Sequence, residues 1–178
     1  MNVQFECIVD KLHSQYKNHS FRYILHLSRK VGKLQLKQKK AKREDMEVNY
    51  QEYLITDNKK LLSPEMVKKL LDNSYWAPDR SLELIAKTIE NSICICVFYE
   101  DELIAFGRVV TDKAFFAWIA DVVVSPPHRG KGLGKEIVQF IQDHPDIPDS
   151  LQLLRTKDAH GLYEKYGFVR NGDFMAKK

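Results

Sequence analysis

A cluster of three glycines between a β-branched segment and a helical pattern constrains this chain more than any other feature. Gly130, Gly132 and Gly134 follow the strand-like residues 122–124 and precede an apolar helical face in residues 133–141. Glycine has no side chain to block a ligand, and the first turn of a helix offers unpaired N–H groups at the positive end of its dipole. The pattern therefore predicts a phosphate-binding loop. The alternative, a tight turn alone, needs a single glycine.

The spacing of these glycines separates the loop from two common nucleotide-binding loops. A dinucleotide fingerprint needs G-x-G-x-x-G within a βαβ unit, whereas here the spacing is G-x-G-x-G and a hairpin pattern precedes it. A Walker loop needs Gly-Lys followed by Ser or Thr, but Lys135 is followed by Glu136. Both nucleotide interpretations fail. Arg129 and Lys131 are expected to add positive charge at the rim of the loop.

Hydrophobic periodicity and capping residues predict the element order βααβββαβαβ. Ser63 and Pro64 favour a helix start, because serine caps helices and proline suits their first turn. The segments 93–99 and 103–110 are typical of a β-hairpin. The expected strands are residues 46–55, 93–99, 103–110, 115–124, 151–154 and 168–175, and the expected helices follow Ser63, Asp79, Gly132 and Lys157.

Basic residues gather in one part of the chain. Residues 29–43 contain eight lysines and arginines and no acid, so the rest of a chain with net charge +4 is acidic. We therefore place a boundary between a basic extension, 1–45, which we expect to be partly helical or disordered, and a domain, 46–178. The basic stretch is typical of a solvated segment; nucleic acid would be contacted only through it. The sequence leaves open whether the chain forms a homodimer.

The remaining composition excludes several classes of protein. No apolar run approaches the roughly 20 residues of a membrane helix, and charges interrupt the first thirty residues, so neither a membrane span nor a signal peptide is expected. We expect a cytoplasmic location and no membrane partner. Cys7, Cys94 and Cys96 do not form a disulfide framework or a zinc motif, and no metal site is expected. Cys94 and Cys96 are interpreted as core residues.

Two segments resemble motifs of the GNAT superfamily of N-acetyltransferases. Residues 124–135, VSPPHRGKGLGK, resemble its V-x-P-x-x-R-G-x-G-x-G segment, and residues 162–168, LYEKYGF, resemble its L-Y-E-K-x-G-F segment. The resemblance covers residues 46–178. It implies an α/β (α+β) fold in which helices flank a central mixed, mostly antiparallel sheet. It also implies a V-shaped splay between the fourth and fifth expected strands, 115–124 and 151–154.

The same resemblance implies acetyl-CoA as co-substrate and no metal. Its pyrophosphate is expected on the amides of residues 129–134, and its pantetheine arm along the backbone of residues 122–124. Threonine stands at 156 where many relatives carry asparagine, so a weaker contact is expected there. The residues expected to contact acetyl-CoA are Val122, Val123, Val124, Arg129, Gly130, Lys131, Gly132, Leu133, Gly134, Lys135, Thr156, Ala159 and Tyr163.

The resemblance further implies direct attack of an amine on the thioester in a ternary complex. Tyr163 matches the position of the usual general acid, and Asp121 is the candidate base, with a turn or an ion pair as its alternative role. A small-molecule or peptide amine is expected as acceptor. The expected acceptor contacts are Tyr75, Trp76, Arg80 and His160. The alternative function is a non-catalytic acetyl-CoA sensor or interaction module with a basic N-terminal arm.

Overall fold

The computed structural model describes residues 43–149, 151–170, 172 and 175. The basic extension predicted over 1–45 lies almost wholly outside these residues, and the boundary at 45 stays a prediction. A compact unit begins at Asp45. Within the described ranges, no helix combines the length and the apolar character that a membrane crossing requires.

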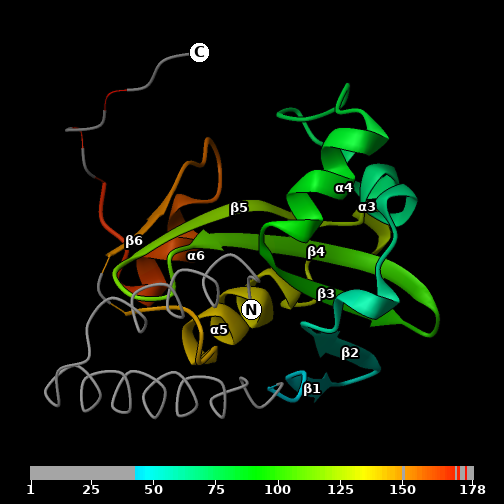
Figure 1. Cartoon of the computed structure of the whole chain (residues 1–178), viewed down its shortest axis with the longest axis horizontal. Helices are drawn as coiled ribbons and strands as arrows, with labels where there is room; N and C mark the ends of the chain where they lie inside the picture. The colour runs from blue at the N-terminus through cyan, green and yellow to red at the C-terminus, as the bar shows by residue number, and fades with distance from the viewer. Residues whose placement is uncertain (1–42, 150, 171, 173–174, 176–178) are drawn as a thin grey trace, which may run out of the picture. The chain divides into compact units, whose positions relative to one another are not determined.

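A six-stranded sheet forms the centre of this unit, in the order β1-β2-β3-β4-β5-β6 (Figure 1). Neighbouring strands are antiparallel except β5 and β6, which are parallel. The sheet is therefore mixed and mostly antiparallel, as predicted. The strands are β1 (Glu47–Tyr50), β2 (Tyr53–Thr56), β3 (Ile93–Tyr99), β4 (Glu102–Thr111), β5 (Phe116–Val124) and β6 (Leu151–Leu154).

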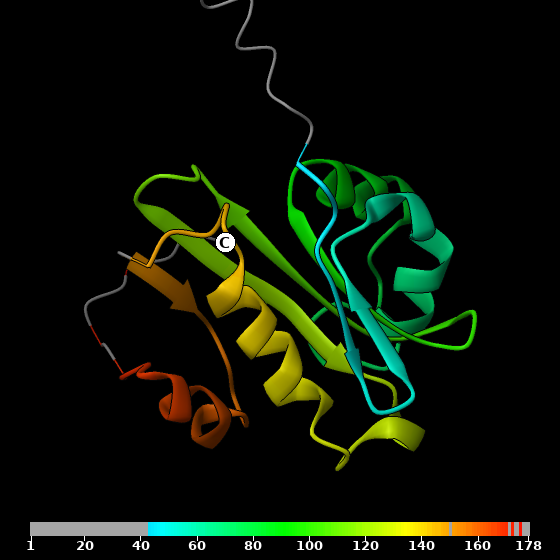
Figure 2. The same cartoon turned by 90° about the horizontal axis from the view of Figure 1, so that it is seen from below.

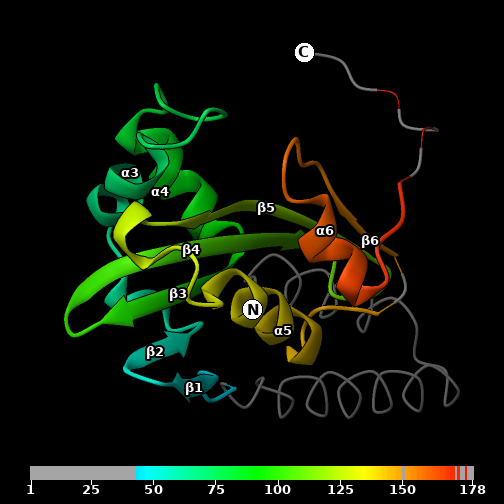
Figure 3. The ribbon, with the colours of Figure 1, turned by 180° about the vertical axis from the view of Figure 1, so that it is seen from behind.

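Helices cover both faces of the sheet. Figures 1 and 3, seen from opposite sides, both place α3 and α4 on one face and α5 on the other. Ser63 caps α3 as predicted, accepting a 3.3 Å bond from the Met66 amide. The helices are α3 (Pro64–Leu71), α4 (Leu82–Glu90), α5 (Leu133–Asp143) and α6 (His160–Tyr163), with short 3-10 turns η1 (Lys59–Leu61), η2 (Pro126–His128) and η3 (Glu164–Tyr166).

Two apolar cores separate these layers. One lies between α5 and the sheet and includes Ile95, Ile119 and Ile137. The other lies between the sheet and α3 and α4. It contains Cys94 and Cys96, both fully buried, in agreement with their interpretation as core residues. Each core removes apolar side chains from water, which is the main favourable contribution to folding.

Two sequence predictions about strands were wrong. Residues 46–55 form no single strand, because a turn at Gln51, with φ of 53°, divides them into the hairpin β1–β2. The apolar alternation already changes there: Tyr50 and Tyr53 are both members of it but are three residues apart. The strand expected over 168–175 is not formed by the described residues of that range, 168–170, 172 and 175.

A β-bulge divides β5 into two parts. The register of β4 against β5 shifts between Phe106 and Arg108. Asp121 has a φ of 54°, a backbone conformation that residues other than glycine rarely adopt. Before the bulge, Ile119 packs into the core beneath α5; beyond it, Val122 does. Asp121 therefore lies on the face covered by α3 and α4, where it contacts Arg80 from the loop between these helices.

Just before the bulge, β5 also leaves its parallel neighbour. The pairing with β6 ends at Ile119 and Leu154, so residues 120–124 have no strand partner on that side within the described chain. This divergence is the predicted splay between the fourth and fifth expected strands. It frees a backbone edge at the end of β5, next to the glycine loop.

A buried histidine and aspartate connect the end of α5 to β2. His144 Nε2 lies 2.9 Å from Asp57 Oδ2, and the two side chains are 0% and 3% exposed. The Asp146 amide donates to His144 Nδ1 at 3.1 Å, so we assign the imidazole proton to Nε2, where it bonds to Asp57. Asp57 Oδ1 accepts a bond of 2.7 Å from the Met46 amide. One polar cluster thus fixes three segments of the unit.

Replacing His144 by alanine should strongly destabilise the unit, because it leaves a buried carboxylate without this partner. We expect a loss of about 3 kcal/mol in the free energy of unfolding, measured by urea denaturation. Lys68→Ala is the matched control, since its ion pair with Asp72 is exposed and should contribute less than about 1 kcal/mol. A loss below about 1 kcal/mol for His144→Ala would contradict this account.

Candidate functional site

The glycine loop presents a row of free backbone amides. Within the described residues, the amides from Gly130 to Gly134 have no protein acceptor, and the Lys135 amide is the next to be bonded, to Gly132 O at 2.8 Å. Gly130 and Gly132 have φ of 78° and 88°, in the left-handed region that favours glycine. Gly132 is the N-cap of α5. The predicted loop geometry is therefore that of an anion-binding helix start.

A hollow of about 300 Å³ lies over this loop. It is bounded by the end of β5, the start of α5 and one residue of α6. Figure 2 shows α5 (yellow) lying across one face of the sheet, with the α6 segment (orange-red) beyond the end of β6. The lining residues are Val124, His128, Arg129, Gly130, Gly132, Leu133, Gly134, Lys135 and Leu162.

The two loop cations differ in where their side chains lie. Arg129 lines the hollow, and its Nε donates to Val124 O at 3.0 Å. Lys131 is not among the lining residues, because its Nζ donates to Tyr53 Oη at 2.9 Å. The predicted rim charge is therefore provided next to the hollow by Arg129, while the Lys131 ammonium is held at the β1–β2 hairpin.

The residues expected to follow the pantetheine arm lie on the free part of β5. Val122 and Val124 pack toward α5, and Val123 packs into the core beneath α3 and α4. The side chains of these three residues are thus packed against the protein. What remains open to a ligand is the backbone edge of residues 122–124, which β6 does not pair. An extended ligand can add to such an edge as a strand does.

A second hollow, of about 320 Å³, lies beside β6 and α6. Thr156 Oγ1 accepts a bond of 3.0 Å from the amide of Ala159, the residue before α6, so the threonine keeps its hydroxyl proton for a further bond. His160 and Tyr163, one helical turn apart, both line the hollow. Its lining residues are Gln152, Leu153, Leu154, Arg155, Thr156, His160, Tyr163, Glu164, Phe168, Val169 and Arg170.

Tyr163 is the buried member of this group. Its ring packs edge-on against Phe168 at 5.8 Å, and the residue is 7% exposed. Burial, with smaller contributions from Asp158 and Tyr75, raises the pKa of Tyr163 to about 12. Within the described chain, no hydrogen bond engages its hydroxyl. The phenol is therefore protonated at neutral pH and has its donor available.

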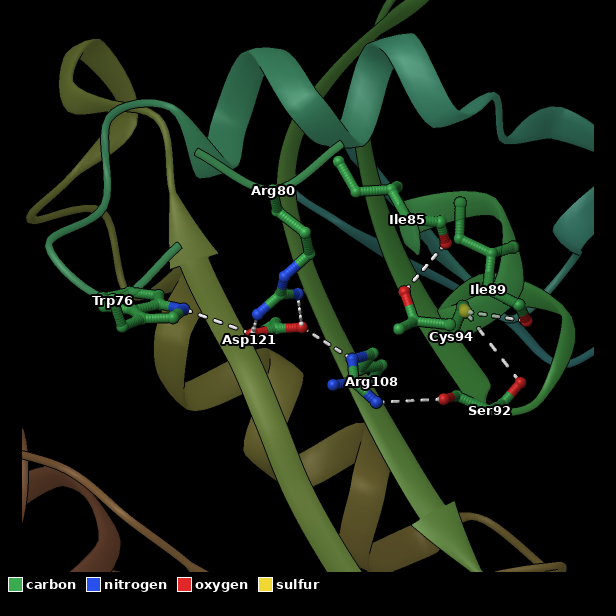
Figure 4. Close-up of polar contacts among 9 residues, drawn as sticks. Trp76, Arg80, Ile85, Ile89, Ser92, Cys94, Arg108 and Asp121 are labelled. Atoms are coloured by element: carbon green, nitrogen blue, oxygen red, sulfur yellow. Dashed lines mark hydrogen bonds and ion pairs between the residues drawn. The ribbon is translucent and has the colours of Figure 1, made fainter. Parts of the chain in front are cut away.

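Asp121 lies at the centre of a polar network on the opposite face of β5 (Figure 4). Arg80 binds it through both Nη atoms, at 2.5 and 3.2 Å, and Arg108 Nε donates to it at 2.6 Å. Trp76 Nε1 donates at 3.2 Å. Burial favours the protonated carboxyl, but the bonds and charges of the two arginines outweigh it and hold the pKa of Asp121 below its usual value. Such a carboxylate is a weak proton acceptor.

The loop between α3 and α4 reaches both sides of the splay. Trp76 contacts Asp121 on β5, while Tyr75 Oη accepts a bond of 3.2 Å from the Lys157 amide after β6. The Tyr75 and Trp76 rings pack edge-on at 4.9 Å, and Lys157 Nζ lies 5.6 Å from the Tyr75 ring centre. Three of the expected acceptor residues, Tyr75, Trp76 and Arg80, thus lie together on the loop between α3 and α4. His160 lies on the wall of the hollow beside β6.

Sequence analysis missed Arg108 and Tyr53. Arg108 is a lone cation in an otherwise apolar strand, and such a charge requires a partner when it is buried. That requirement, applied to the neighbouring strand, would have indicated Asp121. No feature of the sequence indicates the role of Tyr53. Its hydroxyl bonds Lys131 of the glycine loop, and this contact depends on the β1–β2 hairpin, which the sequence did not predict.

The described ranges contain no group of three or more histidine, cysteine, aspartate or glutamate side chains that could hold a metal ion. The candidate groups of the site are therefore amides, a phenol, two aromatic rings and an arginine-bound carboxylate.

Comparisons with known proteins identify one family. Residues 90–170 match the model of the acetyltransferase (GNAT) domain. The uncharacterised N-acetyltransferase ycf52 of Pyropia yezoensis is 29% identical over 133 residues, which are 71% of this chain and 75% of the relative. Glucosamine 6-phosphate N-acetyltransferase of Arabidopsis thaliana is 31% identical over 110 residues, 56% of this chain and 73% of that enzyme.

Solved structures agree with these relatives. A crystal structure from Xanthomonas campestris pv. campestris, of a protein ascribed to the GNAT family of acetyltransferases, has a TM-score of 0.68 and 32% identity. The similarity covers 73% of this chain and 95% of that one. Sheet order, splay, glycine loop and these similarities agree, and the chain belongs to the GNAT family of N-acetyltransferases.

Proposed function

We propose that this chain transfers an acetyl group from acetyl-CoA to a primary amine, by direct attack of the amine in a ternary complex. The observation that carries the proposal is the run of unbonded amides from Gly130 to Gly134 at the start of α5. Backbone donors in such numbers are rarely left without an acceptor, and a pyrophosphate has the charge and the oxygen atoms to accept them.

The fit of acetyl-CoA to this part of the chain rests on two further features. The hollow over the loop lies beside Val124 and Leu162, so it adjoins the free edge of β5. In our proposal the pyrophosphate binds residues 129–135 and the pantetheine arm pairs with residues 122–124. In the same proposal, Thr156, which lines the hollow beside β6, and Ala159, whose amide donates to it, contact the ligand from that side. When bound there, acetyl-CoA supplies the thioester from which the acetyl group is taken.

Tyr163 is proposed as the general acid. Its phenol keeps its proton at neutral pH, because burial raises its pKa to about 12. A free thiol has a pKa near ~8.5, so proton transfer from this phenol to a fully formed thiolate is uphill. We therefore propose that the proton moves while the carbon–sulfur bond breaks and positive charge on the attacking amine is still close.

Asp121 is proposed as a positioning residue, in place of its predicted role as the base. Both of its oxygens are bonded to arginines, and its pKa is lowered, which disfavours accepting a proton. Through the same bonds the carboxylate orients Arg80 and Trp76 on the loop between α3 and α4. The amine is then expected to lose its proton to water.

The acceptor is proposed to be a primary amine held by Tyr75, Trp76, Arg80 and His160. Relatives act on different kinds of acceptor, since one is a glucosamine 6-phosphate N-acetyltransferase and another, from Glycine max, is the histone acetyltransferase TAP1. The exposed rings of Tyr75 and Trp76 offer apolar walls, and Arg80 offers a charge beside them.

Replacing Tyr163 by phenylalanine removes the acidic proton and retains the ring that packs against Phe168. We expect kcat for acetyl transfer to fall about 100-fold or more, with the KM for acetyl-CoA changed less than twofold. The measurement is thiol release with an accepted amine. Tyr99→Phe is the control for loss of a phenol, because within the described chain the Tyr99 hydroxyl makes no hydrogen bond. Unchanged turnover of Tyr163→Phe would remove Tyr163 from the mechanism.

Replacing Gly132 by alanine should weaken acetyl-CoA binding. The new Cβ would lie 2.9 Å from Tyr50 Oη at a backbone φ of 88°, so the loop must change its conformation. We expect the dissociation constant to rise at least about 10-fold, corresponding to about 1.4 kcal/mol of strain, by calorimetric titration. Gly161→Ala, where the added Cβ has open space, should bind normally. Equal affinity of Gly132→Ala and wild type would show that the loop has another use.

A further inference from the structure

Lys131 is a phosphate-loop cation whose charge does not lie over the loop. Its Nζ donates to Tyr53 Oη at 2.9 Å and lies 5.7 Å from the Tyr53 ring centre. Glu52 Oε1 is 3.9 Å away. The hydrogen bond that Lys131 donates to Tyr53 raises the pKa of Lys131, so the ammonium stays charged in this position. These contacts all come from the β1–β2 hairpin, none of whose residues lines the hollow.

Tyr53 connects this lysine to the other end of the loop. It is 1% exposed, and its hydroxyl lies 3.1 Å from His128 Nδ1. An ammonium can only donate, so the Tyr53 oxygen accepts from Lys131 and its proton is free to donate to His128 Nδ1. His128 then carries its proton on Nε2. One buried phenol thus fixes a residue before the glycines and a residue between them.

A second tyrosine of the hairpin holds the loop backbone. Tyr50 Oη donates to Lys131 O at 3.3 Å, and the same oxygen lies where a Cβ on Gly132 would fall. Figure 2 shows the tip of the hairpin (cyan) beside the segment that leads into α5. The side chain and the carbonyl of Lys131 are therefore both bonded to residues of β1 and β2.

From these contacts we propose that the β1–β2 hairpin is a brace for the phosphate loop, with Tyr53 and Lys131 as its positioning residues. The brace holds the amides of Gly130 to Gly134 in one conformation before acetyl-CoA arrives. A binding loop that is ordered in advance loses less conformational entropy on binding, which increases affinity. Lys131 acts through Tyr53, and its charge is not the counter-charge of the bound phosphates. This inference rests on the proposed function.

The alternative role of Lys131 makes opposite predictions. If the ammonium left Tyr53 to pair with a phosphate of acetyl-CoA, Tyr53 would compete with the ligand, and removing its hydroxyl would strengthen binding. If the hairpin braces the loop, removing that hydroxyl weakens binding. The sign of the effect of Tyr53→Phe thus separates the two roles.

The test is a double-mutant cycle read by calorimetric titration of the full chain with acetyl-CoA. Tyr53→Phe retains the buried ring, and Lys131→Met retains an unbranched chain of similar length. We expect each single variant to raise the dissociation constant about 5- to 10-fold. The double variant should bind no more weakly than Tyr53→Phe alone, because Tyr53→Phe already removes the contact that Lys131→Met removes, together with the contact to His128. Lys131→Arg, which can still donate to Tyr53, should restore most of the affinity.

Two further readouts separate positioning from general destabilisation. The KM for acetyl-CoA should rise in both single variants while kcat falls less than twofold. Tyr99→Phe is the matched control: its ring packs near His128, but within the described chain its hydroxyl makes no hydrogen bond, so affinity should not change. A difference in thermal unfolding between Tyr53→Phe and Tyr99→Phe without a difference in affinity would contradict the brace.

The outcomes distinguish this inference from the function on which it rests. Unchanged or tighter binding by Tyr53→Phe, or losses that multiply in the double variant, would overturn the brace while leaving acetyl-CoA binding intact. Failure of the wild-type chain to bind acetyl-CoA would overturn the proposed function and the brace together.

Discussion

The bulge between Gly107 and Asp121 is the constraint on which the site depends. Gly107 has no side chain, and a Cβ there would lie 3.1 Å from Ile137 Cγ2, so α5 packs directly against the backbone of β4. Opposite this point, β5 contains an extra residue and Asp121 adopts a positive φ. Beyond the bulge, the side chains of β5 lie on the opposite face of the sheet from the one that regular alternation would give them. The pairing of β5 with β6 ends close to the same point. In a regular β5, Asp121 would lie on the same face as Ile119 and its carboxylate would not face Arg80.

The two faces of β5 then serve different parts of the reaction that we propose. On the α5 face, the end of the strand leads through η2 into the glycine loop, whose amides point into a hollow. On the α3 and α4 face, Asp121 binds two arginines and Trp76. Buried guanidinium and carboxylate groups are costly unless each finds its partners, and here they do. The network therefore fixes the loop between α3 and α4 next to the cosubstrate's side of the splay.

The sequence predicted most of what depends on local pattern. The glycine loop, the cap of α3 by Ser63 and the antiparallel pairing of 93–99 with 103–110 follow from short-range rules, and the structure has all three. The GNAT motifs extended this to the order of the sheet and to its splay. The three local features could be predicted because the residues that specify each of them are close together in the chain.

Three features that the sequence did not predict involve contacts between distant segments. Asp121 is a non-glycine residue at positive φ, which no local preference predicts; it lies at the bulge opposite Gly107, where α5 packs against β4. Because 46–55 was predicted to be one strand, the β1–β2 hairpin was not expected, nor were the contacts that Tyr53 makes with the glycine loop. Lys131 is expected to contact the cofactor because it lies between two glycines, and this stays a prediction. What the spacing did not predict is that its side chain bonds Tyr53, 78 residues earlier in the chain. Side-chain direction is set by tertiary contacts that sequence spacing does not contain.

The central claim is that the glycine loop binds acetyl-CoA and that the bound thioester is attacked by an amine. The most direct test is calorimetric titration of the wild-type chain with acetyl-CoA, followed by thiol release across a panel of sugar, polyamine, aromatic and peptide amines. We predict one binding site per chain and thiol release that depends on the amine. Binding without release on any amine would favour an acetyl-CoA sensor, and absence of binding would contradict the account of the loop.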